Sequence, residues 1–311
     1  MIKVLKIVRA IPGIPDAGGA ENVCWEIAKS HKEKGLDVEL LIPFNGNTFN
    51  KQNIKINTFP KIKPYGTTYK YFSKILLPEF KKQWDISHFH IASPLPNIFL
   101  DKKKFGKMVV TCHGGDIFPK KTGHDFNNLK YIFSKVDAVT CPSKWLCNYL
   151  FKNYGVKSYF VPNGVDTNKF KKLRNVVKEK NTILYFGRIH HRKGILNLLE
   201  AAKELPNFNF KFIGSGPLVD NLNGKNIEYL GFVDDLVTEI NKAELCIFPS
   251  YWENAPLVGL EAMACGTPII ATKLGFSEII DHKKTGFILN DNNPKTIIGK
   301  IKEFTSDKSK L

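Results

Sequence analysis

Short apolar runs alternate with longer segments in which apolar residues recur every three or four positions, and this alternation fills the first half of the chain. Runs of the first kind are typical of buried β-strands, and segments of the second kind are typical of amphipathic α-helices. The pattern predicts strands at Lys3–Val8, Val38–Ile42, Ile86–His90, Met108–Cys112, Ala138–Cys141 and Ser158–Val161, and helices at Ala20–Lys34, Thr68–Gln83, Asn127–Ser134 and Ser143–Tyr154. Strands that alternate with helices in this way build a parallel α/β sheet.

A charged stretch with little periodicity, residues 168–180, then interrupts the alternation as an interdomain linker would. The same rhythm resumes after it, with strands predicted at Thr182–Phe186, Phe208–Ile213, Ile227–Leu230, Leu245–Phe248, Pro268–Ala271 and Gly286–Leu289, and helices at Lys193–Lys203, Pro217–Asn221, Asp234–Ala243, Pro256–Ala264 and Pro294–Phe304. We therefore predict two Rossmann-like, doubly wound α/β domains, residues 1–167 and 181–311, that face each other across a cleft. Ligands of such sheets bind beyond the carboxyl ends of the strands, so the loops that follow strands are the places to search for chemistry.

Composition narrows the classes of function. A length of 311 residues with 43% hydrophobic content is enough for two cores. No apolar run reaches the roughly 18 residues of a membrane helix, and charges interrupt the N-terminal segment too often for a signal peptide, so we expect a soluble cytoplasmic protein. The six cysteines are scattered without a CxxC pair, which predicts reduced thiols and no metal site.

The formal net charge is +17, and most of the excess lies in residues 1–170. A lysine-rich genome would produce this excess without any partner, whereas a nucleic acid, an anionic membrane or a phosphorylated substrate would each explain it as an attraction. No basic strand is interleaved with aromatic residues, so we expect no nucleic-acid partner. Arginine is the side chain suited to bidentate contact with phosphate, and the chain has only four, so Arg188 and Arg192 in one short run are informative.

Two loops of the first half combine a strand end with glycines. The loop Ile11–Glu21 contains Gly18 and Gly19 at the start of a predicted helix, where bare backbone N–H groups either cradle a phosphate or belong to a plain flexible loop. His113 follows a buried strand and precedes two glycines. Its imidazole is therefore placed to hydrogen-bond a substrate hydroxyl or to carry a proton, the alternative being a purely structural role in the core.

Cations follow a strand end in the second half. Gly187 ends a predicted strand and is followed by Arg188, Arg192 and Lys193 before a helix begins. Such a cluster suits a diphosphate, because fixed cations neutralise the charge that develops as a phosphate leaves, and a solvated basic turn is the alternative. A second junction of strand, glycine and helix at Gly214 either belongs to the same site or is a packing turn.

Two carboxylates flank the start of another predicted helix. Glu253 lies in the loop before Pro256, and Glu261 lies within the helix, so both can point into one cleft. Polyhydroxylated ligands are bound by such acceptors. Glu261 lies in an otherwise apolar stretch, and because an unpaired buried carboxylate is costly, we expect a ligand or a partner for it.

The segment 249–268, with Glu253 and Glu261 eight positions apart, resembles the signature of the retaining glycosyltransferases of family 4, which have the GT-B fold. Five further motifs resemble that family in order and spacing: Gly18–Glu21, His113–Asp116, Val161–Asp166, Gly187–Gly194, and Gly275–Glu278 followed by Gly286 and Phe287. The similarity covers nearly the whole chain. Family members usually run longer and carry a C-terminal helix that crosses back to the first domain, so Pro294–Phe304 is expected to be only the beginning of that helix.

The resemblance implies an enzyme that moves a hexose, with retention of anomeric configuration, from a nucleotide sugar such as a UDP-sugar or GDP-mannose to a glycan or lipid-linked acceptor. Neither a metal nor another cofactor is implied. The implied catalytic residues are His113, Arg188, Lys193 and Glu253. The implied donor-binding residues are Gly18, Gly19, Gly187, Arg188, Lys193, Gly214, Phe232, Glu253, Asn254, Ala255, Pro256, Leu257 and Glu261. The alternative is a GT-B epimerase that acts on a nucleotide sugar without an acceptor.

Within this family resemblance each residue has an implied contact. Arg188 and Lys193 would hold the donor diphosphate, and Gly19 would let its backbone touch the phosphates. Glu261 would bind the ribose hydroxyls, whereas Glu253 would bind the hydroxyls of the transferred sugar. His113 would contact that sugar near its reacting face.

The resemblance also divides the positive charge into parts. The chain lacks the Asp-x-Asp motif by which the other large transferase fold binds a metal, which is consistent with cations taking the place of a metal. The remaining excess falls on the domain expected to hold the acceptor, in Lys81-Lys82, Lys102–Lys104 and Lys120-Lys121. We therefore expect this domain to dock on an anionic membrane as a peripheral protein.

Overall fold

The computed structural model describes residues 1–7, 18–43, 54–59, 83–90, 102–115, 117 and 126–306. The chain divides into two compact units, residues 1–162 and 163–311. The predicted linker, residues 168–180, is part of the second unit and is bonded to it: the Leu173 N–H donates to Asn241 Oδ1 at 2.8 Å, and Lys178 Nζ donates to Thr267 Oγ1 at 2.7 Å.

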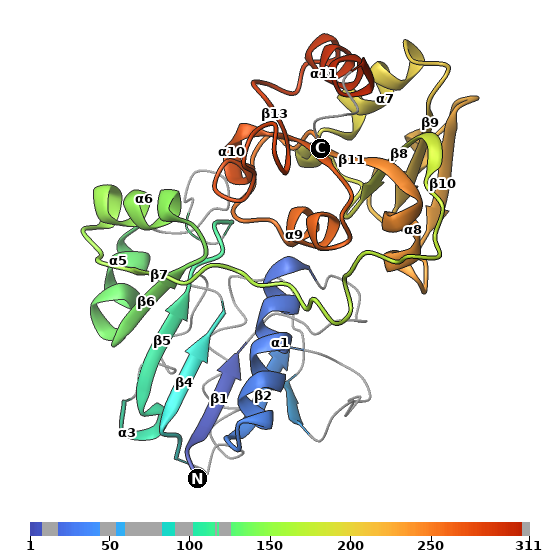
Figure 1. Ribbon diagram of the computed structural model, residues 1–311. Helices are drawn as coiled ribbons and strands as arrows, with labels where there is room; N and C mark the ends of the chain where they lie inside the picture. Colours follow the sequence, from blue (N-terminus) through green and yellow to red (C-terminus); the bar gives the residue numbers. More distant parts are fainter. Residues whose placement is uncertain are drawn as a thin grey trace. The chain divides into compact units, whose positions relative to one another are not determined.

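The first unit contains one parallel sheet (Figure 1). Its strands are β1 (Lys3–Ile7), β2 (Asp37–Pro43), β3 (Lys55–Phe59), β4 (Ile86–Phe89), β5 (Lys107–Thr111), β6 (Ala138–Cys141) and β7 (Tyr159–Phe160). They lie in the order β3-β2-β1-β4-β5-β6-β7, and every neighbouring pair is parallel. Six of the seven were predicted to within a residue or two, whereas the edge strand β3 was not predicted.

The described helices of the first unit are α1 (Gly19–Glu33), α3 (Lys102–Phe105), α5 (Phe126–Lys135) and α6 (Lys144–Tyr154). Their ends follow local chemistry. The Gly18 N–H donates to the Glu21 side chain at the start of α1, and Ser143 accepts the Leu146 N–H at the start of α6. The predicted helix Thr68–Gln83, apart from Gln83, and residues 11–17 of the predicted glycine loop lie outside the described residues.

Both faces of the first sheet are buried, as expected for parallel strands that alternate with helices. Side chains of adjacent strand residues point to opposite faces, so Val4 packs with Cys24 and Ala28 of α1, whereas Leu5 belongs to the cluster that contains Leu146 of α6. The face beneath α1 becomes important below, because polar residues lie there among the apolar ones.

The second unit contains a second parallel sheet. Its strands are β8 (Glu179–Phe186), β9 (Asn209–Ile213), β10 (Ile227–Gly231), β11 (Ala243–Phe248), β12 (Ile269–Thr272) and β13 (Gly286–Leu289), in the order β10-β9-β8-β11-β12-β13. Its helices are α7 (Ile195–Lys203), α8 (Leu236–Lys242), α9 (Leu257–Ala264), α10 (Lys273–Phe276) and α11 (Pro294–Ser306), with 3₁₀ turns at His191–Lys193 and Val219–Asn221. All strands are parallel and the order is doubly wound, so the predicted α/β class is confirmed in both units.

Aromatic packing fixes the centre of the second unit. Phe248 of β11 stacks on Phe276 with ring centroids 5.7 Å apart and meets Phe186 of β8 edge-on at 5.2 Å. Helices α7 and α11 pack side by side, as Figure 1 also shows. Across the part of the chain that is described, no helix combines the length and the apolar character that a bilayer crossing requires.

Candidate active site

Loops that follow β8 and β9 meet at the carboxyl end of the second sheet. The Gly187 N–H donates to the Ile213 carbonyl at 3.0 Å, and the Ile189 N–H donates to the Ser215 carbonyl at 2.8 Å. Gly214 has φ +127°, and a Cβ at this position would collide with the Gly187 carbonyl oxygen. Only glycine allows this close approach, so the loop of the predicted phosphate cations is anchored to the Gly214 loop.

An ion pair joins the β8 loop to the β11 loop. Lys193 ends the 3₁₀ turn His191–Lys193, and its ammonium contacts Glu253 Oε1 directly. The same carboxylate oxygen accepts a hydrogen bond from Ser250 Oγ at 2.9 Å. The side chains of Lys193 and Glu253 are 18% and 10% exposed, so the pair is largely shielded from water. The structure thus brings together two residues that lie 60 positions apart in the sequence, and adds Ser250 as a partner.

Glu261 has a different environment. It lies in α9, one helix after the Glu253 loop, and no side chain in the described part of the chain bonds its carboxylate. Burial raises the pKa of Glu261 to about 7, opposed by the positive charge of Lys169. The expected need for a partner is therefore unmet within the second unit, and at neutral pH this carboxyl group is divided between its charged and uncharged forms.

The remaining candidates of the second unit surround these groups. The Arg188 carbonyl accepts a hydrogen bond from the Tyr185 hydroxyl at 2.7 Å, and the Arg188 side chain is exposed. The guanidinium of Arg192 lies 4.8 Å from the ring centroid of Trp252, an aromatic partner that the sequence did not reveal. Phe232, just after β10, is 82% exposed.

The start of α9 holds the other predicted donor contacts. Ala255 has φ +47°, a strained value for a residue with a side chain, and its carbonyl accepts the Asn163 side-chain amide at 2.8 Å. Asn254 directly precedes Ala255. Pro256 then precedes α9, and Leu257 begins it. In the first unit, Gly18 and Gly19 begin α1, as predicted.

His113 lies beyond the carboxyl end of β5 in the first unit. Its Nε2 is 3.4 Å from His90 Nδ1. Burial lowers the pKa of His113 to about 4, so the ring is neutral at physiological pH. A proton carrier needs a pKa near the operating pH, and hydrogen bonding is therefore the role that the structure favours for His113. Asp116, in the same predicted motif, lies outside the described residues.

Comparison with known proteins decides the family. The family model described as Glycosyltransferase Family 4 matches residues 17–169, and the one described as Glycosyl transferases group 1 matches residues 166–311. An uncharacterized glycosyltransferase of Methanocaldococcus jannaschii is 30% identical over 98% of this chain and 89% of its own length. The chain belongs to the family 4 glycosyltransferases. It is an enzyme that transfers a sugar from a nucleotide-sugar donor.

Two further proteins are similar to this glycosyltransferase. The Escherichia coli UDP-Gal:alpha-D-GlcNAc-diphosphoundecaprenol alpha-1,3-galactosyltransferase is 26% identical over 73% of this chain and 68% of its own length. The solved structure of Anabaena HepE in complex with UDP-glucose has a TM-score of 0.80 at 19% identity, over 100% of this chain and 91% of that one. The likeness to this structure, together with the two parallel sheets, confirms the GT-B fold of the glycosyltransferase.

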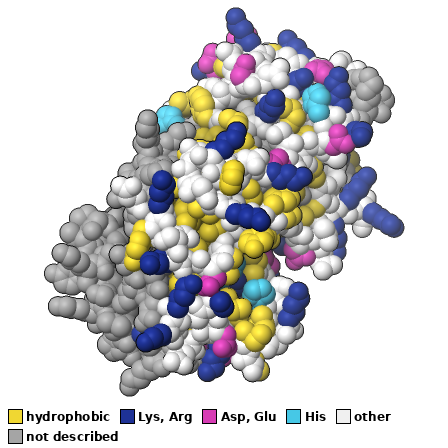
Figure 2. Space-filling view, turned by 90° about the vertical axis from the view of Figure 1, so that its left-hand side faces the viewer, with side chains coloured by type: hydrophobic (Ala, Val, Ile, Leu, Met, Phe, Trp, Pro, Cys, Tyr) yellow, Lys and Arg dark blue, Asp and Glu magenta, His cyan; other side chains and the backbone are white. Residues whose placement is uncertain are grey.

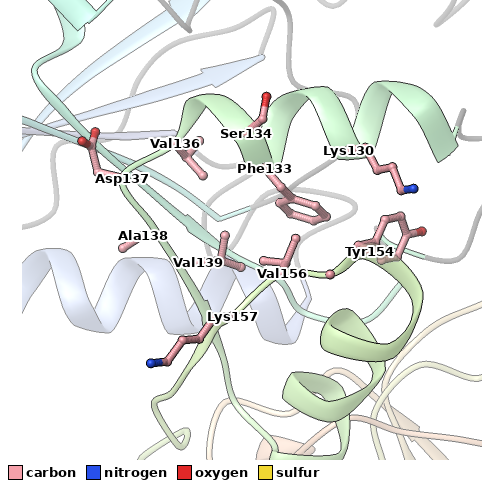
Figure 3. Close-up of a pocket in the computed structure, with 11 residues that line it drawn as sticks. Lys130, Phe133, Ser134, Val136, Asp137, Ala138, Val139, Tyr154, Val156 and Lys157 are labelled. Carbon is pink, nitrogen blue, oxygen red and sulfur yellow. The ribbon is translucent and has the colours of Figure 1, made fainter.

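The first unit of the glycosyltransferase also contains a cavity of about 510 Å³, which does not include any of the predicted site residues (Figure 3). It opens between the ends of α5 and α6 and the beginning of β6, where Asp137, Val139 and Tyr154 line it. These residues lie toward the amino ends of the strands, whereas His113 follows a carboxyl end. The cavity is therefore separate from the candidate active site.

A glycine holds Glu253 in place in the glycosyltransferase, and this contact gives a prediction. Gly275 has φ +88°, and a Cβ there would overlap the backbone of Glu253, whose N–H donates to the Leu274 carbonyl. We expect Gly275→Ala to lower the free energy of unfolding by about 1–3 kcal/mol and to reduce activity. Urea unfolding measures the first effect, with Gly299→Ala in α11 as the control, because a Cβ on Gly299 meets no atom. Equal stability of the two variants would contradict the steric argument.

The low pKa of His113 gives a second prediction. Unfolded histidine has a pKa near 6.5, so between pH 6.5 and about 4 the unfolded chain binds a proton that the folded glycosyltransferase does not. Stability contributed by neutral His113 is therefore lost as the pH falls, by about 2 kcal/mol between pH 7 and pH 5. Urea midpoints at both pH values test this expectation, and His113→Phe should show a smaller loss than the wild type. Identical losses would count against the buried, neutral ring.

Proposed function

We propose that this glycosyltransferase moves a hexose, with retention and without a metal ion, from a UDP- or GDP-sugar to a glycan or lipid-linked acceptor. The observation that carries this proposal is the buried Glu261 carboxyl, which has no hydrogen-bond partner among the described residues and lies in the helix that follows the Glu253 loop. Ribose offers two adjacent hydroxyl donors to such a carboxylate. Hydrogen bonds to a charged acceptor are the stronger kind, so a nucleoside satisfies Glu261 better than water does.

The cations of the β8 loop suit the donor diphosphate. Arg188 is exposed and free to swing toward a ligand, and Lys193 is fixed by its contact with Glu253. The bare backbones at Gly18, Gly19, Gly187 and Gly214 give close access for phosphate oxygens, and the residues that lead into α9, Asn254 to Leu257 except Pro256, offer further N–H groups. Phe232, exposed after β10, would stack on the base.

Chemistry on one face of the sugar follows from these roles. In the proposed step the bond from the anomeric carbon to the donor phosphate breaks, and a bond to the acceptor oxygen forms on the same face. The acceptor hydroxyl gives its proton to the leaving phosphate oxygen. Arg188 and Lys193 stabilise the charge on the departing diphosphate, while Glu253 and neutral His113 hold sugar hydroxyls. The paired carboxylates of a glycosidase are not required.

The acceptor class is proposed from charge and from one relative. The Escherichia coli relative is named for an acceptor that is linked to diphosphoundecaprenol. Lys102 and Lys107 in the first unit share Asp137 as an ion-pair partner, and basic side chains on the face in Figure 2 are dispersed among acidic and uncharged ones. Lys81-Lys82 and Lys120-Lys121 lie outside the described residues. We propose electrostatic docking on an anionic membrane, where each lysine near the surface adds about 1 kcal/mol.

Sedimentation with vesicles tests the membrane proposal. Binding to vesicles with anionic lipid should exceed binding to neutral vesicles and should fall as salt rises. Equal binding to both kinds of vesicle, or none to either, would contradict the membrane proposal and would indicate that the positive charge reflects only a lysine-rich composition.

A screen of nucleotide sugars tests the transferase proposal. UDP-glucose, GDP-mannose and related donors are added singly, and the rise in Tm identifies the donor. Mass spectrometry of the products with glycan and lipid-linked acceptors then shows the transfer. An isomerised nucleotide sugar formed without an acceptor would favour the epimerase instead. No response to any nucleotide sugar would refute both.

A further inference from the structure

A row of polar side chains crosses one buried face of the first sheet. Lys6 of β1 and His88 of β4 are register partners, and Lys6 Nζ lies 3.0 Å from His88 Nδ1. His88 Nε2 is 2.7 Å from Thr111 Oγ1, which in turn is 2.7 Å from Thr140 Oγ1 of β6. Strands of a parallel sheet that is buried on both faces are usually almost wholly apolar. Four linked polar side chains on neighbouring strands are therefore a departure that calls for a reason.

The contacts of His88 determine where its proton lies. The pKa of Lys6 is lowered only to about 8, so its side chain is mostly an ammonium at pH 7; an ammonium can only donate, and His88 Nδ1 is therefore the acceptor in this contact. The proton of the neutral ring is then on Nε2, which donates to Thr111 Oγ1. Thr111 and Thr140 share a further hydrogen bond, in which either hydroxyl can be the donor. The direction of donation is thus defined from Lys6 through His88 to Thr111.

His90 links this row to His113. It follows β4, is 1% exposed, and its ring lies against His88 with centroids 4.1 Å apart and against His113 with centroids 5.6 Å apart. His90 Nδ1 and His113 Nε2 are 3.4 Å apart, whereas His90 Nε2 is buried and has no hydrogen-bond partner in the described structure.

The partnerless nitrogen indicates the tautomer of His90. A buried N–H without an acceptor is rarer than a buried acceptor without a donor. The proton of a neutral His90 ring is therefore on Nδ1, and the bare nitrogen is Nε2. With the proton on Nδ1, His90 donates to His113 Nε2, so the proton of a neutral His113 is on its Nδ1.

We propose that His90 is a positioning residue for sugar transfer: its Nδ1–H donates to His113 Nε2 and holds that ring in one orientation and one tautomer, a role that rests on the sugar contact proposed for His113. This bond fixes which His113 nitrogen faces His90, and its loss would remove that restraint on the ring. A misplacement of about 1 Å is enough to cost a large part of a rate.

The surroundings keep the histidine rings neutral, which the tautomer argument requires. Burial lowers the pKa of His90 well below its ordinary value, and the charges of His88, Lys6, His113 and His31 lower it further. Burial also lowers the pKa of Lys6 to about 8, opposed by Cys24. A doubly protonated ring would donate from both nitrogens and could not accept from a neighbour. The buried setting therefore preserves one donor and one acceptor on each ring.

Three replacements of His90 separate positioning from packing. His90→Phe keeps the ring and removes both nitrogens, and it is expected to lower kcat by a factor of about 10 to 100 while the donor KM changes less than twofold. His90→Asn places an amide N–H near the position of Nδ1 and is expected to restore most of kcat. His90→Gln places its amide near Nε2 and is not expected to do so. A kcat for the Phe variant within twofold of the wild type, or equal kcat values for Asn and Gln, would overturn the proposal.

Nitrogen NMR of the free protein tests the tautomer without any substrate. Long-range ¹H–¹⁵N spectra of ¹⁵N-histidine-labelled protein distinguish bare from protonated ring nitrogens. We expect a bare Nε2 on His113 and a bare Nδ1 on His88, and a shifted His113 Nε2 resonance in His90→Phe, because the donor to that nitrogen is removed. A protonated Nε2 on His113 of the wild type would overturn the proposal. If the wild type transferred no sugar, the proposed function would fail, but these spectra would still decide whether His90 sets the His113 ring.

Discussion

Replacement of Lys193 by methionine is expected to reduce kcat for sugar transfer by a factor of about 10² to 10³. The Lys193 ammonium is the one cation of the β8 loop that is fixed by a carboxylate on the β11 loop, within the described residues. A preorganised charge of this kind costs no rearrangement when the diphosphate departs. Steady-state kinetics with the donor identified by the nucleotide-sugar screen measure the effect, and the loss should fall mainly on kcat.

Loss of the ion pair must be separated from loss of catalysis. Removal of Lys193 leaves the Glu253 carboxylate, which is 10% exposed, with only the Ser250 hydroxyl as its described donor. Breaking a buried pair in this way is strongly destabilising, so the single variant could lose activity by unfolding. The double variant Lys193→Met/Glu253→Gln removes both charges and provides the control. If the double variant recovers Tm but its kcat falls well below that of Glu253→Gln alone, the lysine acts on the reaction. Recovery of both would show that its role is structural.

Donor binding by the wild type is expected to be about tenfold tighter at pH 8 than at pH 6. The pKa of Glu261 is raised to about 7 by burial, so most of the carboxyl groups are protonated at pH 6 and most are charged at pH 8. Ribose hydroxyls donate best to the charged form, so binding releases a proton from Glu261. A nucleotide sugar is the right probe, because its diphosphate is esterified at both ends and has no proton to lose in this range.

Two variants make this expectation specific to Glu261. Glu261→Gln should bind the donor more weakly by a factor of about 10 to 100 and should bind it equally at pH 6 and pH 8. The exposed Glu204 at the end of α7 supplies the control, and Glu204→Gln should keep the wild-type affinity and pH dependence. Calorimetry in two buffers of different ionisation enthalpy counts the released proton. A pH dependence that survives in Glu261→Gln would assign the proton to another group.

The same pKa has the opposite effect on the free protein. Folded Glu261 binds a proton at pH values where the unfolded carboxyl does not, so its contribution to stability is lost as the pH rises from about 4.5 to about 7. His113 behaves in the reverse sense over the same range. The donor therefore binds best at high pH, where the buried, charged Glu261 carboxylate lowers the stability of the free protein most.

Glycines and apolar runs made much of the site predictable. Gly187 and Gly214 mark strand ends, and because the carboxyl ends of parallel strands meet at one edge of a sheet, their loops were expected to lie together. Glu261 lies alone in an apolar helix, so burial and the need for a ligand or partner were expected for it; the structure shows the burial in its raised pKa. Periodicity and local chemistry are enough for conclusions of this kind.

Contacts between distant strands were not predictable in the same way. His90 ends a predicted strand and His113 directly follows another, but no glycine comes after His90, so its sequence context does not mark it as part of a site. Its importance depends on the register of β1, β4 and β5, which a single sequence does not specify. Side-chain conformation was not predictable either. The position of Arg192 in the cation cluster after Gly187 indicated a phosphate contact, but its rotamer places the guanidinium over Trp252.

The ion pair between Lys193 and Glu253 has a consequence for the end of the catalytic cycle. A lysine with no counter-ion would hold a spent nucleoside diphosphate tightly, and release of that product would limit turnover. Here Glu253 stays paired with the ammonium and offsets part of its charge, so the lysine is expected to hold the departing diphosphate less tightly. The protein thus carries its own competitor for the leaving group, and the carboxylate proposed to hold the sugar before transfer is also expected to help to empty the site after it.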